Sequence, residues 1–274
     1  MSSLATITQP IVESLSELDE VTGILCFGSY ALETYDQHSD IDLYVLCHPD
    51  ILPDRIRRDT FTSSTKATKV MIGCHTPGWD NQWSPVSDNI TLGQIDFDIS
   101  YNTQTWLATV VNKVVQEGAV SIPELKFRAY TMLGLLANAI VLYEHQRWIT
   151  QLKANLFPYP ARLKANLIEQ NNTILVDRLQ ELEDCAKRDI GHTMFLFHLW
   201  QACDALITIL FAINNFYDPA TKRPEREFGK LEKIPANFTE RYQQILEGPF
   251  DKDGRQQMVR LLRGLTTEVT QFLT

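Results

Sequence analysis

The cysteines of this chain show no informative spacing. There are five, scattered and odd in number, and none forms a Cys-x-x-Cys pair. This usage excludes a Cys-x-x-Cys redox or metal motif and fits a reducing compartment, so we expect a cytoplasmic protein. Cys26 and Cys47 lie inside apolar segments, where we expect buried thiols. The amino terminus has neither a basic segment nor a long apolar core, so we expect no signal peptide.

Long apolar runs are also missing. The most apolar stretch, residues 193–213, contains His198, Gln201 and Asp204. A membrane-spanning helix needs a long and predominantly apolar segment, so these interruptions favour a buried helix. We therefore expect no association with a membrane.

Positive charge is scarce as well. The formal net charge is -9, and no basic run is longer than Arg55-Ile56-Arg57-Arg58. A protein that binds long nucleic acids needs a positive surface that displaces counterions. The acidic balance therefore argues against a long nucleic acid as partner, and it is compatible with a small, cationic acceptor.

What is present describes an ordinary globular protein. The chain has 274 residues, of which 44% are hydrophobic and 22% are charged. This length holds one large domain or two modest ones. The first part alternates helix and strand patterns, and the part after residue 102 is predominantly helical. The sequence predicts an α+β fold, with a mixed sheet and flanking helices in residues 1–118 and an all-helical bundle in residues 119–274.

Hydrophobic periodicity gives the expected elements. Strands are predicted at 23–27, 41–47 and 69–74, and a hairpin or bulged strand at 90–99. A helix at 53–61 carries three arginines, which place it mainly on the surface. Later helices are predicted at 104–116, 123–143, 147–156, 161–186, 188–216, 238–248 and 255–273. Trp79 and Trp83 lie in a long loop at 76–89, where they either stack on a ligand or pin the loop to the core.

The most informative motif is Gly28-Ser29 followed by Asp40-Ile41-Asp42. The two small residues form a turn after one apolar strand, and the two acids begin a second one. Side chains at positions i and i+2 of a strand point to the same face, so Asp40 and Asp42 converge. Two convergent carboxylates beside a phosphate-sized turn indicate a divalent metal and a nucleoside triphosphate.

This arrangement resembles the polymerase-beta-type nucleotidyltransferase superfamily, whose signature is Gly-Ser followed by Asp-x-Asp. The resemblance implies two Mg²⁺ ions held by Asp40 and Asp42, and a nucleoside triphosphate, ATP above all, held by Gly28 and Ser29. Glycine lets the backbone approach a phosphate, and the serine hydroxyl and nearby amides can hydrogen-bond to it. No lysine or arginine lies between Ser29 and Asp42, and Glu33 stands there instead. The cation for the triphosphate must therefore come from elsewhere in the chain.

Two-metal transfer needs a third carboxylate. Asp96 and Asp98 share one face of the predicted strand that contains them, because they alternate with Ile95, Phe97 and Ile99. In the superfamily this acid sits between apolar residues, which favours Asp98 as the catalytic residue. Asp96 stays open as a metal ligand.

The second half is similar to the helical domain of bacterial lincosamide and aminoglycoside nucleotidyltransferase-like proteins. The similarity rests on Val141-Leu142-Tyr143-Glu144, Phe157-Pro158-Tyr159-Pro160, Lys187-Arg188-Asp189 and residues 212–222. It implies a domain that closes over the metal site and supplies contacts to the acceptor.

Several residues of this half are candidates for those contacts. Lys222 or Arg188 would reach the triphosphate, and Asn214 and Tyr217 would line the acceptor site. Glu144 is a candidate base. The structural alternatives are a solvated lysine at 222, a helix-end ion pair at 188, and a surface glutamate at 144.

The predicted activity is metal-dependent transfer of a nucleoside monophosphate, AMP above all, to a hydroxyl group of a small acceptor. Two alternatives stay open. One is adenylylation of a protein, as in toxin–antitoxin transferases, and the other is a nucleotide-binding or interaction module without activity. A homodimer is also left open.

Overall fold

The structure is a computed structural model that describes residues 4–65, 67–74, 82–122, 128–220 and 224–273. Its contacts divide the chain into two compact units. The first comprises residues 1–160 with 219–221, and the second comprises residues 161–218 with 222–274. The two compact units thus meet between Pro160 and Ala161, whereas the sequence predicted a domain boundary between residues 118 and 119.

The first unit is built on one mixed sheet with the strand order β3-β4-β5-β2-β1-β6. Strands β2 and β5 are parallel, and the other neighbours are antiparallel. The strands are β1 (Val21–Phe27), β2 (Ile41–Cys47), β3 (Lys69–Met71), β4 (Val86–Leu92), β5 (Ile95–Thr103) and β6 (Ile140–Glu144).

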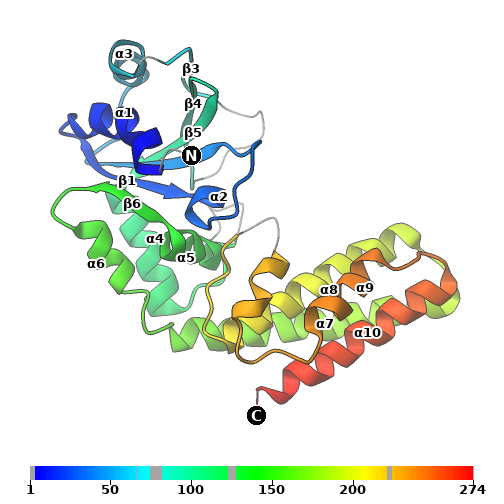
Figure 1. The fold of residues 1–274 in the computed structure, drawn as a ribbon. Coiled ribbons are helices and arrows are strands. Elements are labelled where there is room, and N and C mark those ends of the chain that lie inside the picture. The colour runs from blue at the N-terminus through cyan, green and yellow to red at the C-terminus, as the bar shows by residue number, and fades with distance from the viewer. Residues whose placement is uncertain (1–3, 66, 75–81, 123–127, 221–223, 274) are drawn as a thin grey trace. The chain divides into compact units, whose positions relative to one another are not determined.

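Helices cover both faces of this sheet (Figure 1). Helices α1 (Leu4–Ser16) and α3 (Asp54–Ser64) pack on one face, where Ile11, Leu15 and Phe61 join the apolar core. Helices α4 (Gln104–Glu117) and α5 (Ala129–Asn138) cover part of the other face. The short helices α2 (Gly28–Ala31) and α6 (Trp148–Ala154) follow β1 and β6. The mixed sheet with flanking helices that the sequence predicted is confirmed.

The hairpin of β4 and β5 is also confirmed. Its two strands are joined by Gly93 and Gln94, and Gly93 has a positive φ of 62°. A two-residue turn of this kind favours glycine, because glycine adopts positive φ without a steric cost. The hairpin carries Asp98, the predicted third carboxylate, to the centre of the sheet.

The helix predicted at 123–143 is wrong in its last part. Residues 140–144 form β6, which pairs antiparallel with β1, Gly23 lying opposite Glu144. A short apolar run is compatible with either a strand or a buried helix, and only the neighbouring strand decides between them. Because β6 extends the sheet, the segment that precedes residue 160 belongs to the first unit.

Helix α3 differs from its prediction at one residue. Arg57 is buried, with 1% of its surface exposed, and not on the surface as expected. Its guanidinium lies 2.8 Å from the carboxylate of Asp88, which is fully buried, and it also contacts Asp54. The backbone N–H of Gly73 donates to the same Asp88 carboxylate at 2.9 Å. This buried ion pair ties α3, β4 and the segment after β3 together.

The second unit is helical, as predicted. It contains α7 (Ala161–Arg188), α8 (His192–Ile213), α9 (Phe238–Glu247) and α10 (Lys252–Gln271), with two 3-10 turns at Pro224–Arg226 and Phe228–Lys230. Helix α8 is long and apolar enough to cross a membrane by length and composition alone. However, 72% of its most apolar window is buried inside the protein, which is typical of a core helix.

Candidate active site

One row of side chains crosses the sheet of the first unit. Strand register pairs Phe27 with Asp42, Asp42 with Asp98, Asp98 with Asn89, and Asn89 with Met71. Paired residues on neighbouring strands share a face of the sheet. The row therefore places two carboxylates side by side at its centre, in the middle of an otherwise uncharged line.

The position of Asp42 explains why residue 28 is a glycine. A Cβ atom at Gly28 would collide with the Asp42 carboxylate, and Gly28 also has a positive φ of 70°. Both facts favour glycine there. The sequence assigned the open space at Gly28 to a phosphate, whereas in the structure the nearest occupant of that space is the carboxylate of Asp42. The turn and the acid of the motif thus fit each other directly.

The two candidates for the third carboxylate have different surroundings. Asp98 lies beside Asp42 and is half-buried, whereas Asp96 is exposed and accepts a hydrogen bond from Thr91 Oγ1 at 2.7 Å. Burial raises the pKa of Asp98, and the negative charge of Asp40 raises it further. Asp40 is exposed just before β2 and is thus close enough to act on Asp98. The register thus places Asp42 beside Asp98, and Asp40 lies just before the same strand, whereas Asp96 is turned to Thr91.

The donor atoms in this row suit a hard divalent cation, because carboxylate oxygens are the ligands that Mg²⁺ prefers. The carboxylate side chains do not converge on one point in this structure. Among the described residues, no group of three or more His, Cys, Asp or Glu side chains stands in an arrangement that could hold a metal ion. The chemistry of the carboxylates therefore fits Mg²⁺, and their side chains would have to turn towards a common point.

A cleft of about 420 Å³ opens beside the two carboxylates. It lies over β5, β4 and the segments after β3 and before β4. Its lining residues are Phe27, Asp42, Met71, Cys74, Trp83, Ser84, Ser87, Asn89, Asp98 and Ser100. Two acids, one amide, three hydroxyl groups and one thiol thus face an apolar wall. None of the described lining residues carries a positive charge.

Trp83 forms part of that wall and also holds its loop to the sheet. Its ring stacks on Tyr44, with 4.2 Å between centroids and 5° between planes. The Tyr44 hydroxyl donates to the Trp83 carbonyl at 2.7 Å, and the Asn102 amide donates to the carbonyls of Gln82 and Trp83. Trp83 is therefore a loop anchor whose ring still borders the cleft. Trp79 lies outside the described residues.

Ser29, the predicted contact to phosphate, is the second residue of the four-residue helix α2. Glu33, just after it, is exposed and has a positive φ of 56°. Tyr30 and Tyr35 stack beside the turn, with 4.3 Å between ring centroids. Lys222, the predicted source of positive charge, lies outside the described residues.

The other candidates from the helical half have structural partners. Arg188 pairs with Asp184 at 2.9 Å on the same helix, and Asp189 pairs with the buried Arg255. Asn214 closes a turn by hydrogen bonds with Lys233, its Oδ1 accepting from the Lys233 N–H at 2.7 Å. These contacts match the structural alternative for Arg188.

Two further candidates have structural surroundings as well. Tyr217 is buried, with 6% exposed. Glu144 caps α6, because its carboxylate accepts from the backbone N–H of Thr150 at 2.8 Å and from the Thr150 hydroxyl. The contacts of Glu144 are those of a helix cap.

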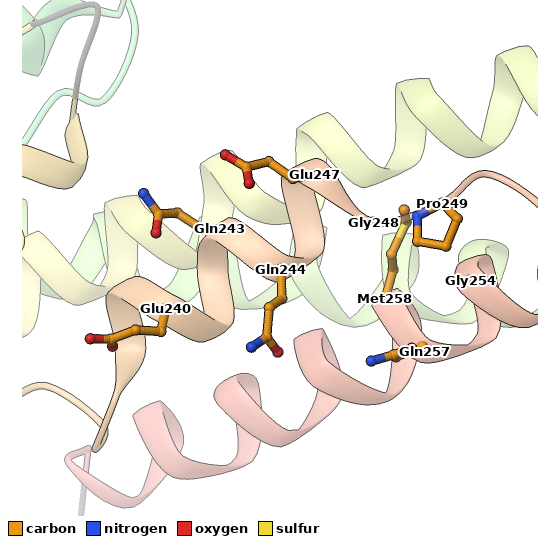
Figure 2. Close-up of a pocket in the computed structure, with 9 residues that line it drawn as sticks. All are labelled: Glu240, Gln243, Gln244, Glu247, Gly248, Pro249, Gly254, Gln257 and Met258. Atoms are coloured by element: carbon orange, nitrogen blue, oxygen red, sulfur yellow. The ribbon is translucent and has the colours of Figure 1, made fainter.

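A second pocket lies wholly inside the helical unit, between α9 and α10 (Figure 2). It has a volume of about 450 Å³ and is lined by Glu240, Gln243, Gln244, Glu247, Gly248, Pro249, Gly254, Gln257 and Met258. Its described lining contains no cation, no hydroxyl or thiol side chain, and none of the predicted site residues. Its larger volume therefore does not make it the better candidate.

Comparison with known proteins bears on the motif. Residues 9–70 match the family model described as "Nucleotidyltransferase domain". This segment of the first unit is thus similar to a nucleotidyltransferase domain. The matched residues include Gly28, Ser29, Asp40 and Asp42, and they end before Asp98. The match thus supports the first half of the site, and Asp98 rests on the strand register.

The chain was also compared with curated proteins and with solved structures. No curated protein matches. Among solved structures, the chain is similar to the nucleotidyltransferase-like protein from Exiguobacterium sibiricum 255-15. The two are 12% identical with a TM-score of 0.46, over 98% of this chain and 78% of the other.

Proposed function

We propose that the protein transfers a nucleoside monophosphate from a nucleoside triphosphate, with ATP as the expected donor, to a hydroxyl group of a small acceptor. The observation that carries this proposal is the register of β1, β2 and β5, which aligns Asp42 and Asp98 directly beside the Gly28-Ser29 turn. The family match of the N-terminal unit agrees with it.

Each group of the row has a distinct role in this reaction. Ser29 and the backbone amides of its turn would bind the terminal phosphates. Asp40, Asp42 and Asp98 would hold two Mg²⁺ ions, with Asp96 at the margin of the site. Bound Mg²⁺ would offset the charge of the triphosphate and favour the ionised acceptor hydroxyl.

The chemical step exchanges one bond for another. The acceptor oxygen bonds to the α-phosphorus, the bond between the α-phosphorus and the bridging oxygen breaks, and pyrophosphate leaves. Asp98 would accept the proton of the acceptor hydroxyl through a carboxylate oxygen that is not bound to metal, because it lies beside Asp42 on the side of the cleft.

Substitution Asp42→Asn tests the proposal. We expect Mg²⁺-dependent transfer from radiolabelled ATP to fall on the order of 10³-fold, since stabilisation of charge by a metal contributes several kcal/mol. Asp50→Asn removes an exposed acid outside the row and should leave the rate unchanged. Full activity of Asp42→Asn would exclude the assignment.

A nucleotide-binding module without activity is the second candidate. This candidate is favoured by the arrangement of Asp42 and Asp98 and their neighbours. Among the described residues, these side chains do not form a group that could hold a metal ion. Calorimetry with ATP and Mg²⁺ separates the two. Metal-dependent binding without turnover over a broad panel of acceptors would support the module, and mass spectrometry of cell proteins carrying added AMP would instead support a protein acceptor.

A further inference from the structure

The row from Phe27 to Met71 has the Gly28-Ser29 turn at one end, directly after Phe27. The 420 Å³ cleft begins at Phe27 and Asp42, and most of its lining lies beyond Asp42, on β5, β4 and the segments beside them. In phosphoryl transfer the attacking and leaving oxygens lie roughly in line on opposite sides of phosphorus. If pyrophosphate leaves towards Ser29, the acceptor hydroxyl must approach from the side of Asp98, where most of the cleft lies.

We propose that this cleft is the acceptor site, and that the β3–β4 edge of the first unit recognises the acceptor. The inference rests on the proposed function above. It moves acceptor recognition away from the helical half, where the sequence resemblance had placed it. The residues assigned to recognition are Asn89, Ser87, Ser100 and Trp83.

The lining defines the chemical class of the acceptor. Serine hydroxyls and the Asn89 amide offer both donors and acceptors, which suits a molecule that carries several hydroxyl groups. Asp42 and Asp98 would repel a phosphate or carboxylate, and none of the described lining residues would neutralise one. Trp83 offers an apolar surface for one face of a ring. The acceptor is therefore a hydroxylated ring, neutral or positively charged, without an anionic group.

Asn89 is the central residue of this surface. It lies next to Asp98 in the row and is half-buried in the cleft wall. No hydrogen bond joins its amide to another side chain in the described part of the chain, whereas Ser87 donates to the Cys74 carbonyl and Ser84 donates to Ser100 Oγ at 2.9 Å. The Asn89 amide is thus available to a ligand, and its loss leaves the wall intact.

The wall itself is held from the opposite face of the sheet. Asp88, between Ser87 and Asn89, points into the core and binds Arg57 and the Gly73 N–H. Next to Gly73, the Cys74 N–H donates to the Ser87 carbonyl at 2.7 Å. The acceptor surface is therefore fixed before any ligand enters, which lowers the entropic cost of binding.

Cys74 provides a direct reporter of this cleft. It is the partly exposed cysteine, and the other four are buried. Burial raises the pKa of the thiols of Cys26 and Cys203 to about 12 and that of Cys47 to about 11. Because the thiolate is the reactive form, neutral iodoacetamide should label Cys74 selectively, and Cys74→Ser identifies the signal.

The experiment measures the rate of Cys74 alkylation by mass spectrometry, with Mg²⁺ and α,β-methylene ATP in every sample that contains a sugar, and with reference samples with and without the nucleotide analogue. The probes are glucose and glucosamine, paired with the anionic glucose 6-phosphate and gluconate. We expect glucose or glucosamine to slow alkylation several-fold, and the anionic probes and the nucleotide analogue alone to leave it unchanged. Protection by the nucleotide alone, equal protection by the anionic probes, or no protection by any sugar overturns the proposal.

A substitution assigns the effect to the cleft wall. Asn89→Ala should abolish the protection by sugar without changing the affinity for α,β-methylene ATP, and Asn172→Ala on α7 serves as the matched control. Retained protection in Asn89→Ala contradicts the role of Asn89. If the unaltered protein does not bind α,β-methylene ATP, the proposed function is refuted. If it binds the nucleotide but no sugar protects Cys74, only the acceptor site is refuted.

Discussion

Two aspartates on neighbouring strands of one hairpin have opposite surroundings. Asp88 of β4 is fully buried and binds the Arg57 guanidinium at 2.8 Å and the Gly73 N–H at 2.9 Å. Asp98 of β5 faces the other side of the sheet, lies beside Asp42, and forms no ion pair with any cation in the described part of the chain. The same residue type thus has a cationic partner on one face and, among the described residues, none on the other.

The difference distinguishes a structural acid, Asp88, from Asp98, the acid that we propose to be functional. A buried charge is tolerated when a partner charge and hydrogen bonds offset its desolvation. Asp88 meets that condition, whereas burial and a nearby carboxylate raise the pKa of Asp98. A protein keeps such an uncompensated acid where a bound cation or a proton transfer will use it.

Breaking the satisfied pair should have the largest effect on stability. Arg57→Met leaves Asp88 buried without its partner, and the free energy of unfolding should fall by about 3–5 kcal/mol. Urea denaturation measures the change, and the exposed Arg58→Met is the control. A loss below about 1 kcal/mol would mean that Asp88 is solvated by another route.

Gly28→Ala should affect the functional side most. The added methyl group collides with the Asp42 carboxylate, and an L-residue at positive φ costs roughly 1–2 kcal/mol. Both the free energy of unfolding and the transfer from ATP should fall. Gly229→Ala is the control, because a Cβ atom there meets no neighbour within 4 Å. Unchanged activity in Gly28→Ala would separate the turn from Asp42.

Glu144 provides a third acid for the comparison, held by backbone and hydroxyl donors. Burial alone would raise its pKa, but hydrogen bonds from Thr150 outweigh this and lower it. Glu144→Ala should reduce stability by about 1 kcal/mol, as for other helix caps, and should leave transfer unchanged.

The pH dependence of Glu144 gives an independent check. Because its pKa is lowered on folding, the contribution to stability is present above the unfolded pKa and disappears as the pH falls through the folded pKa. Thermal melts of the wild type and Glu144→Ala should therefore converge in acid, with Glu17→Ala, an exposed acid after α1, as control. A loss of transfer at unchanged stability would restore Glu144 as a catalytic base.

Asp98→Asn should have the smallest effect on stability, and of opposite sign. The folded pKa of Asp98 is raised, so its ionised form disfavours folding at neutral pH, and this penalty vanishes below the unfolded pKa. Without Mg²⁺, Asp98→Asn should melt slightly higher than the wild type at pH 7 and equally in strong acid. In Asp40→Asn, carbon-detected NMR should show a lower pKa for Asp98; an unchanged value would disprove their coupling.

Local patterns in the sequence predicted the centre of the first unit. Apolar runs marked β1 and β2, and alternation placed Asp96 and Asp98 on one face. Cys26 and Cys47 are buried as expected. These predictions succeeded because each depends on residues that are close together in the sequence.

The features that escaped prediction depend on distant partners. Arg57 looked like a surface residue because Asp88, which buries it, follows 31 residues later. Residues 140–144 were predicted to be helical because β1, the strand with which they pair, lies more than a hundred residues earlier in the sequence. The boundary between the compact units lies at Pro160, later than the predicted domain boundary, because β6 joins the sheet of the first unit. No local pattern encodes such pairings.

The pairing of β1 with β6 has a consequence for biosynthesis. On the ribosome, β1 emerges long before residues 140–144, so its outer edge keeps unpaired N–H and C=O groups while more than a hundred residues are added. Such an edge can pair with another chain. A nascent protein whose synthesis stalls before β6 therefore carries a strand edge that can pair with other chains. Once residues 140–144 have emerged, β6 pairs with this edge.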